Sequence, residues 1–149
     1  MTRFTLYWLP VLAWAGVIFA FSSQSSLPQA DPPLLDTVAK KGAHFLEFGV
    51  LGWLLLRAFG GSTKPSHRSG AEIAEISLLF PRPYAYALGL ALLYAIGDEL
   101  HQGLTPRRTP SPVDVAIDAL GVAAALVAGR LLARRGGGNS QQITDGGKG

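Results

Sequence analysis

Nine polar or charged residues in this chain have side chains suited to ligand binding or proton transfer. They are Lys41, His44, Glu47, Asp98, Glu99, Gln102, Arg108, Asp114 and Asp118. The candidates for acid–base catalysis are His44, Glu47, Asp98 and Glu99, because imidazole and carboxyl groups can transfer protons. Arginine can hold a carboxylate or phosphate through two hydrogen bonds, which makes Arg108 a candidate for binding an anionic group. We predict that the nine residues form one binding site, and we assign none of them to a metal.

The spacing of these residues is helical. Lys41, His44 and Glu47 recur at intervals of three, whereas Asp98 and Gln102, and then Asp114 and Asp118, are four apart. Residues three or four apart share one face of a helix. The pattern therefore predicts three helices that each present a polar stripe, with Arg108 in the short loop between the last two.

The composition indicates that these helices lie in a membrane. Charged residues make up 15% of the 149 residues and hydrophobic residues 48%, with a mean hydropathy of +0.27. A soluble domain carries about 25% charged residues, so the balance excludes a disordered chain and argues against an ordinary soluble enzyme. Cysteine is absent, which excludes disulfides and cysteine-ligated zinc.

Four apolar runs divide the chain, at residues 4–21, 42–56, 83–97 and 113–129. Since a spanning helix needs about 20 largely apolar residues, we predict an all-α integral membrane bundle of four short transmembrane helices in residues 1–135. Residues 22–41, 60–82 and 101–112 would connect them, and the Gly/Ser/Gln-rich segment 136–149 would be a disordered cytoplasmic tail. Cleavage of the first run as a signal peptide is the competing interpretation.

The apolar runs also contain small residues that affect helix packing, and ionisable residues near their ends. Gly89 and Gly121, with the alanines around them, are small enough to let helix backbones approach closely. His44 and Glu47 would lie at the start of the second helix, Asp98 and Glu99 at the end of the third. The polar stripes would then meet at one end of the bundle.

The distribution of basic residues predicts the orientation, because short cytoplasmic loops are enriched in lysine and arginine. With four spans, nine of the 13 basic residues fall on the side that holds both termini, and four fall on the other side. Both termini are therefore predicted to be cytoplasmic. Seven of the ten acidic residues lie on the outer side with the polar stripes. The basic surplus is thus an orientation signal, and we expect no nucleic-acid partner.

The outer cluster has several interpretations that stay open on the sequence alone. Asp114, Asp118 and Arg108 could form a buried ion pair that only joins the helices. The cluster could instead bind a substrate or an anionic headgroup. His44-x-x-Glu47 and Asp98-x-x-His101 could hold a divalent metal, although the adjacent Lys41 and arginines compete with a cation. Proton conduction is the fourth interpretation.

Four motifs in this order resemble the VanZ-like family over about residues 8–130. They are Pro10, Trp14 and Ser22-Ser23-Gln24; Lys41-x-x-His44-Phe45 with Gly49 and Gly52; Asp98-Glu99-x-x-Gln102 followed by Pro106-x-Arg108; and Asp114, Asp118 and Gly121. Two departures affect the loop: Arg107 stands where the family commonly has glycine, and residues 109–112 replace a Gly/Ser loop.

The resemblance implies a small multi-pass protein of the bacterial cytoplasmic membrane. The family's founding member is associated with resistance to glycopeptide antibiotics such as teicoplanin, without an agreed reaction. We expect the lipid bilayer as a partner, and a lipid-linked or anionic envelope ligand in an outward-facing polar pocket. The alternatives are an intramembrane enzyme that acts on a lipid-linked envelope precursor and a non-catalytic membrane scaffold.

Overall fold

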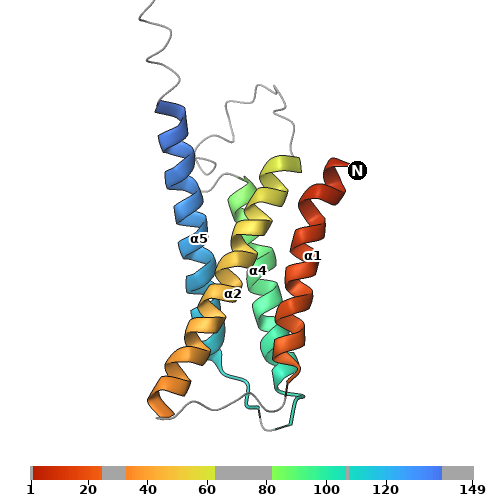
Figure 1. Cartoon of the computed structure of the whole chain (residues 1–149), viewed down its shortest axis with the longest axis vertical. Coiled ribbons are helices and arrows are strands. Elements are labelled where there is room, and N and C mark those ends of the chain that lie inside the picture. Colours follow the sequence, from red (N-terminus) through yellow and green to blue (C-terminus); the bar gives the residue numbers. More distant parts are fainter. Residues whose placement is uncertain (1, 25–32, 63–81, 107, 139–149) are drawn as a thin grey trace, which may run out of the picture.

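The described residues of the computed structural model, 2–24, 33–62, 82–106 and 108–138, form an all-helical bundle. Its helices are α1 (Arg3–Ser22), α2 (Pro33–Ser62), α4 (Arg82–Gln102) and α5 (Pro112–Gly138), which run alternately up and down (Figure 1). The C-terminal ends of α1 and α4 therefore meet the N-terminal ends of α2 and α5. We call this the acidic end. The predicted all-α class is confirmed, whereas residues 139–149 of the predicted tail lie outside the described part.

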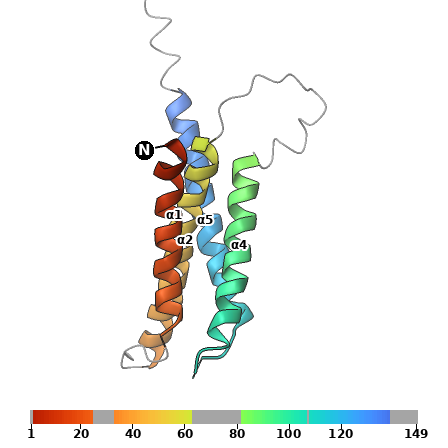
Figure 2. The same ribbon diagram turned by 90° about the vertical axis from the view of Figure 1, so that its right-hand side faces the viewer.

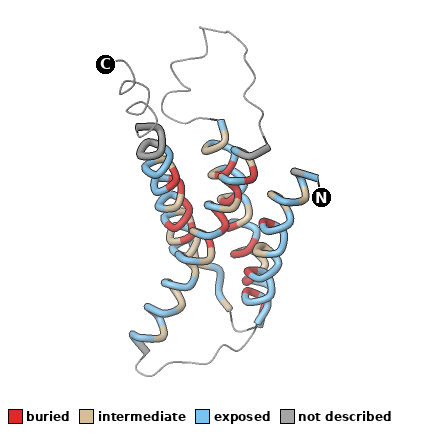
Figure 3. The backbone as a smooth tube through the Cα atoms, turned by 45° about the horizontal axis from the view of Figure 1, so that its top comes forward, coloured by how far each residue is buried: buried red, intermediate tan, exposed pale blue. Residues whose placement is uncertain are grey.

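Three of the helices are long and apolar enough to cross a membrane, over Phe4–Ser22, Leu34–Gly60 and Pro112–Ala133. Helix α4 has 21 residues but is less apolar, since it contains three tyrosines and ends in acidic residues. Large apolar side chains such as Leu12, Leu93 and Leu120 are exposed. The backbone in Figure 3, coloured by burial, shows exposed positions along every helix. These faces suit a lipid bilayer.

Helix α2 begins earlier than the sequence analysis expected. Residues 33–41, which we assigned to a connecting segment, are helical. Pro33 occupies the first helical position, where its missing N–H costs least, and Asp36 in the first turn suits the helix dipole. Lys40 Nζ also lies 2.6 Å from Asp36 Oδ2, one turn apart. His44 and Glu47 consequently lie three to four turns inside α2 and not at its start.

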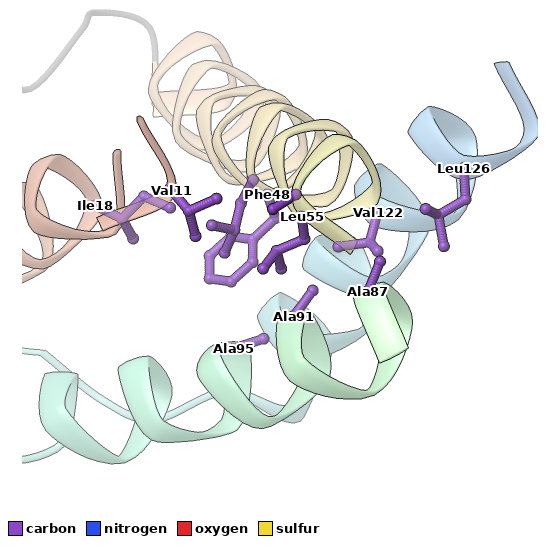
Figure 4. Close-up of a cluster of buried hydrophobic side chains, with 11 residues drawn as sticks. Val11, Ile18, Phe48, Leu55, Ala87, Ala91, Ala95, Val122 and Leu126 are labelled. Atoms are coloured by element: carbon purple, nitrogen blue, oxygen red, sulfur yellow. The ribbon is translucent and has the colours of Figure 1, made fainter. Parts of the chain in front are cut away.

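Helix α2 lies centrally and packs against α1, α4 and α5, with its largest contact on α5. Figure 1 shows α2 between α1 and α5, and in the view at right angles to it α4 lies to one side of these three helices (Figure 2). The core between them is formed by Ile18, Phe48, Leu55 and Val122, to which α4 contributes alanines (Figure 4). Because the alanines of α4 recur at helical spacing, at 87, 91 and 95, one face of α4 is smooth enough to pack closely.

The contact between α2 and α5 is close enough to require glycine. A Cβ atom on Gly121 would overlap the carbonyl oxygen of Phe45, and one on Gly52 would lie 3.1 Å from Val122. The prediction for Gly121 is therefore confirmed. The prediction for Gly89 is wrong, because this residue is exposed and no heavy atom lies within 4 Å of the place where its Cβ would be.

Two hydrogen bonds attach α1 to the other helices. Trp14 Nε1 donates to the backbone carbonyl of Glu47 over 2.9 Å, and Tyr94 Oη donates to the carbonyl of Ala15 over 2.6 Å. Near the opposite end, Trp8 packs edge-on against Phe59. These bonds fix the height of α1 relative to α2 and α4, and thereby place Ser22 at the acidic end.

Candidate ligand-binding site

Two polar pairs join α2 to α5 at the acidic end, and we call them the outer rung and the inner rung. In the outer rung, Lys41 Nζ lies 2.6 Å from Asp114 Oδ1. In the inner rung, His44 Nδ1 lies 3.1 Å from Asp118 Oδ1. The side chains of the outer rung are 40% and 24% exposed, whereas those of the inner rung are 16% and 1% exposed. The helical spacing of both pairs therefore produces a gradient from half-exposed to buried.

Asp98 joins α4 to α1. Its Oδ2 accepts hydrogen bonds of 2.8 Å from Ser22 Oγ and from Gln102 Nε2. Ser22, Asp98 and Gln102 are all buried. The spacing of Asp98 and Gln102 correctly predicted that they share a face. The role of Ser22 was missed, because the sequence analysis placed residue 22 at the start of a connecting segment.

Glu99 connects the end of α4 with the start of α5. Its Oε1 accepts a 2.5 Å hydrogen bond from the backbone N–H of Ser111. The carbonyl of Ser111 in turn accepts from the backbone N–H of Val115, so Ser111 immediately precedes α5 at its N-cap position. Glu99 thus holds the loop that brings Asp114 to Lys41.

Arg108 binds neutral acceptors. Its guanidinium donates to Gln102 Oε1 over 2.8 Å and to the backbone carbonyls of Gln24 and Phe21. Phe21 lies in the last turn of α1 and Gln24 just beyond it, where the helix dipole favours a cation. Among the described residues, no carboxylate lies within ion-pair distance of Arg108. The interpretation in which Arg108 forms a buried ion pair with Asp114 and Asp118, one of the four left open by the sequence, is therefore wrong, since these acids bond to Lys41 and His44.

Glu47 of α2 and His101 of α4 also lie at the acidic end. The Glu47 carboxylate is partly buried and interacts electrostatically with His44, Asp98 and Asp118. The ring of His101 hydrogen-bonds to Ser23 Oγ over 3.0 Å and stacks on Phe19 of α1. All nine predicted site residues thus lie at the acidic end, with His101 on its α1–α4 side.

Three buried carboxylate oxygens in the cluster have no hydrogen-bond partner. They are Asp98 Oδ1, Glu99 Oε2 and Asp118 Oδ2. Asp98 and Glu99 are each 5% exposed and Asp118 is fully buried. Buried polar atoms are normally paired, because an unpaired one loses its hydration without compensation. The geometry does not favour a metal: within the described ranges, no three histidine, aspartate or glutamate residues are grouped so that they could hold an ion.

The chain was compared with protein families, curated proteins and solved structures. The model of the VanZ/LLP1 family matches residues 6–133, which is most of the chain and includes every residue of the cluster. No curated protein and no solved structure matches the chain significantly. The match over four helices, with the polar motifs at one end, shows that this chain belongs to the VanZ/LLP1 family.

Proposed function

We propose that this protein is a cell-envelope membrane protein that binds the head of an amphiphilic or anionic ligand at its acidic end. The observation that carries the proposal is the convergence of polar side chains from all four helices at that end. Lys41 and Arg108 would contact the anionic part of the ligand. His44, Glu47 and Asp98 would orient it through hydrogen bonds or exchange a proton with it. The ligand pocket would open outward from the membrane.

The proposed topology has four spans in residues 1–135, with both termini and residues 136–149 in the cytoplasm. The up-and-down arrangement supports an even number of crossings, and α4 has about the length that a span needs. Packing α4 against three more apolar helices shields its polar end from lipid. Arg57 and Arg82 lie at the end opposite the acidic end. Basic residues are enriched on the cytoplasmic side, so this opposite end would face the cytoplasm.

A reporter fused to the C-terminus tests this topology in a bacterial inner membrane. Fluorescence from a cytoplasmic reporter, without activity from a periplasmic phosphatase at the same position, is the expected result. Phosphatase activity alone would overturn the orientation and with it the outward-facing site. Sequencing the mature N-terminus of the same fusion shows whether α1 is retained.

We also propose a link to glycopeptide resistance, which the family resemblance suggests and which is tested in a susceptible host. We expect the wild-type chain to raise the inhibitory concentration of teicoplanin, and Asp98→Asn or Arg108→Ala to abolish this rise. Asp36→Asn is the matched control, because Asp36 pairs with Lys40 on the first turns of α2. All variants are compared at equal membrane abundance and melting temperature. No protection by the wild type would refute the link, and full protection by both folded cluster variants would refute the proposed site.

A further inference from the structure

We propose that the ligand of the acidic end carries a primary ammonium group that donates hydrogen bonds to unpartnered carboxylate oxygens of α4 and α5. This inference rests on the proposed function and narrows its ligand to a chemical class. The three unpartnered atoms at the acidic end are all carboxylate oxygens. An ionised carboxylate only accepts hydrogen bonds, so the missing partner must be a donor.

The existing partners of these acids leave their charge uncompensated. Asp98 accepts from a hydroxyl and an amide, and Glu99 accepts from a backbone N–H. Only Asp118 bonds to a group that can become cationic, the imidazole of His44. Within the described part of the chain, neither Asp98 nor Glu99 has a lysine, arginine or histidine at ion-pair distance. A buried carboxylate without a cation is strongly destabilised, so these two favour a positively charged partner.

The charge balance of the cluster also favours a ligand that carries a positive charge. Its carboxyl groups are those of Glu47, Asp98, Glu99, Asp114 and Asp118, whereas Lys41 and Arg108 are its permanent cations. Arg108 is hydrogen-bonded to neutral acceptors and forms no ion pair with these acids, and among them its charge acts on Glu47. A ligand that is only anionic would add to this negative surplus, and an ammonium group would reduce it.

The positions of the acids suit an ammonium better than a metal. Asp118 interacts electrostatically with Asp98, and Glu99 interacts with Asp118, so the carboxylates of α4 and α5 contribute to one region of negative potential. No metal-binding group of three was found among the described residues. An ammonium has three N–H donors and needs no fixed coordination shell, so separate oxygens on two helices can share it.

The ion pair of the outer rung shows how the ammonium group of a ligand would be bound. The ammonium of Lys41 already lies 2.6 Å from Asp114 Oδ1, at the half-exposed part of the cluster. Asp118 lies one turn deeper on the same face of α5. An incoming headgroup meets the outer rung first. Separation of this one ion pair would give it a path to the buried acids.

Three short-chain phospholipids with identical acyl chains test the inference on the purified full-length protein. A phosphoethanolamine head carries positive charge with three N–H donors, a phosphocholine head carries the charge without them, and a phosphoglycerol head has donors without positive charge. Binding is measured by native mass spectrometry and by the fluorescence of Trp14, whose indole contacts Glu47. We expect the ethanolamine lipid to bind roughly tenfold more tightly than either other lipid, as one or two charge-assisted hydrogen bonds would give.

Matched variants locate the binding. Asp118→Asn and Glu99→Gln keep the size of the side chain and remove its charge, and we expect each to abolish the preference for ethanolamine. Asp36→Asn should retain the full preference. Thermal melting of each variant shows that it is folded.

The possible outcomes separate this inference from the proposed function. Equal binding of the ethanolamine and choline lipids would overturn the ammonium donor, as would a preference that survives both cluster variants. Tightest binding of the glycerol lipid would overturn the inference and leave an anionic ligand in place. Failure of the wild type to bind any of the three would contradict both.

Discussion

The contact between α2 and α5 has two regions that are built on different principles. In its middle, Gly49, Gly52 and Gly121 bring the two backbones together, and the space between them is filled. At its acidic end, the same two helices are joined by the outer and inner rungs, beside carboxylate oxygens that have no partner. Among the described residues, the buried side-chain oxygens without a hydrogen-bond partner all lie at the acidic end, and none lies in the middle. Unsatisfied polar groups in an otherwise well-packed protein mark the places where function overrides stability.

The largest effect is expected from Gly121→Ala in the middle region. The added methyl group would overlap the Phe45 carbonyl oxygen, and a backbone atom cannot move aside as a side chain can. We expect a loss of more than about 3 kcal/mol in the free energy of unfolding, above the usual cost of overpacking. Thermal or steric-trapping unfolding in detergent measures it. Gly89→Ala is the control and should gain up to about 1 kcal/mol, because its site is open and alanine favours helix. Equal effects of the two substitutions would contradict the close contact.

A smaller loss is expected from Ser22→Ala at the acidic end. This change removes one of the two donors to the buried Asp98 carboxylate and should cost about 1–2 kcal/mol in the free energy of unfolding. Ser23→Ala is the comparison variant: Ser23 also bonds to the Phe19 carbonyl and to His101, but it is exposed, so water can replace these bonds and stability should change by less than about 0.5 kcal/mol. The same unfolding assay compares them. If the two variants were equally stable, the Ser22–Asp98 bond would not join α1 to α4.

The inner rung is tested by a double-mutant cycle with His44→Gln and Asp118→Asn. We expect a coupling energy of about 0.6–1.7 kcal/mol, the range found for hydrogen bonds between membrane helices. The coupling should change little with salt, because both side chains are shielded from solvent. Additive effects of the two substitutions would show that the pair does not contribute as a unit.

The smallest effect is expected from the outer rung. A cycle with Lys41→Met and Asp114→Asn should give a coupling of about 0–1 kcal/mol, because both side chains are substantially exposed. This coupling should fall on going from low salt to about 1 M, where screening acts within about 3 Å. A coupling larger than that of the inner rung would reverse the gradient from which we inferred the path of the ligand.

Periodicity and composition were sufficient to predict the elements and the end at which the polar residues gather. Helical spacing placed Asp98 with Gln102 and Asp114 with Asp118, since such spacing is a local property of the chain. Partners across helices were not predicted. The hydroxyl of Ser22 and the carboxylate of Asp98 are 76 residues apart, and nothing in the sequence near Ser22 indicates which acid it meets.

The glycines show the same limit of sequence reasoning. Gly89 and Gly121 both lie in alanine-rich apolar runs, and locally they are alike. Only the rotation of each helix within the bundle decides that Gly121 faces Phe45 and Gly89 faces outward. The early start of α2 was missed for a different reason. Hydropathy detects the apolar part of a helix, but residues 33–41 are helical through Pro33 and the Asp36–Lys40 pair.

The contact between α2 and α5 also constrains the order in which the protein can assemble. Phe45 and Gly121 are separated by most of the middle of the chain, so α2 is synthesised long before its main partner exists. Contacts at such separation form late, after the intervening chain has been made. Lys41 and His44 therefore cannot pair with Asp114 and Asp118 until α5 is inserted. Insertion of α5 thus closes the glycine contact and supplies the acidic partners of Lys41 and His44 in one step.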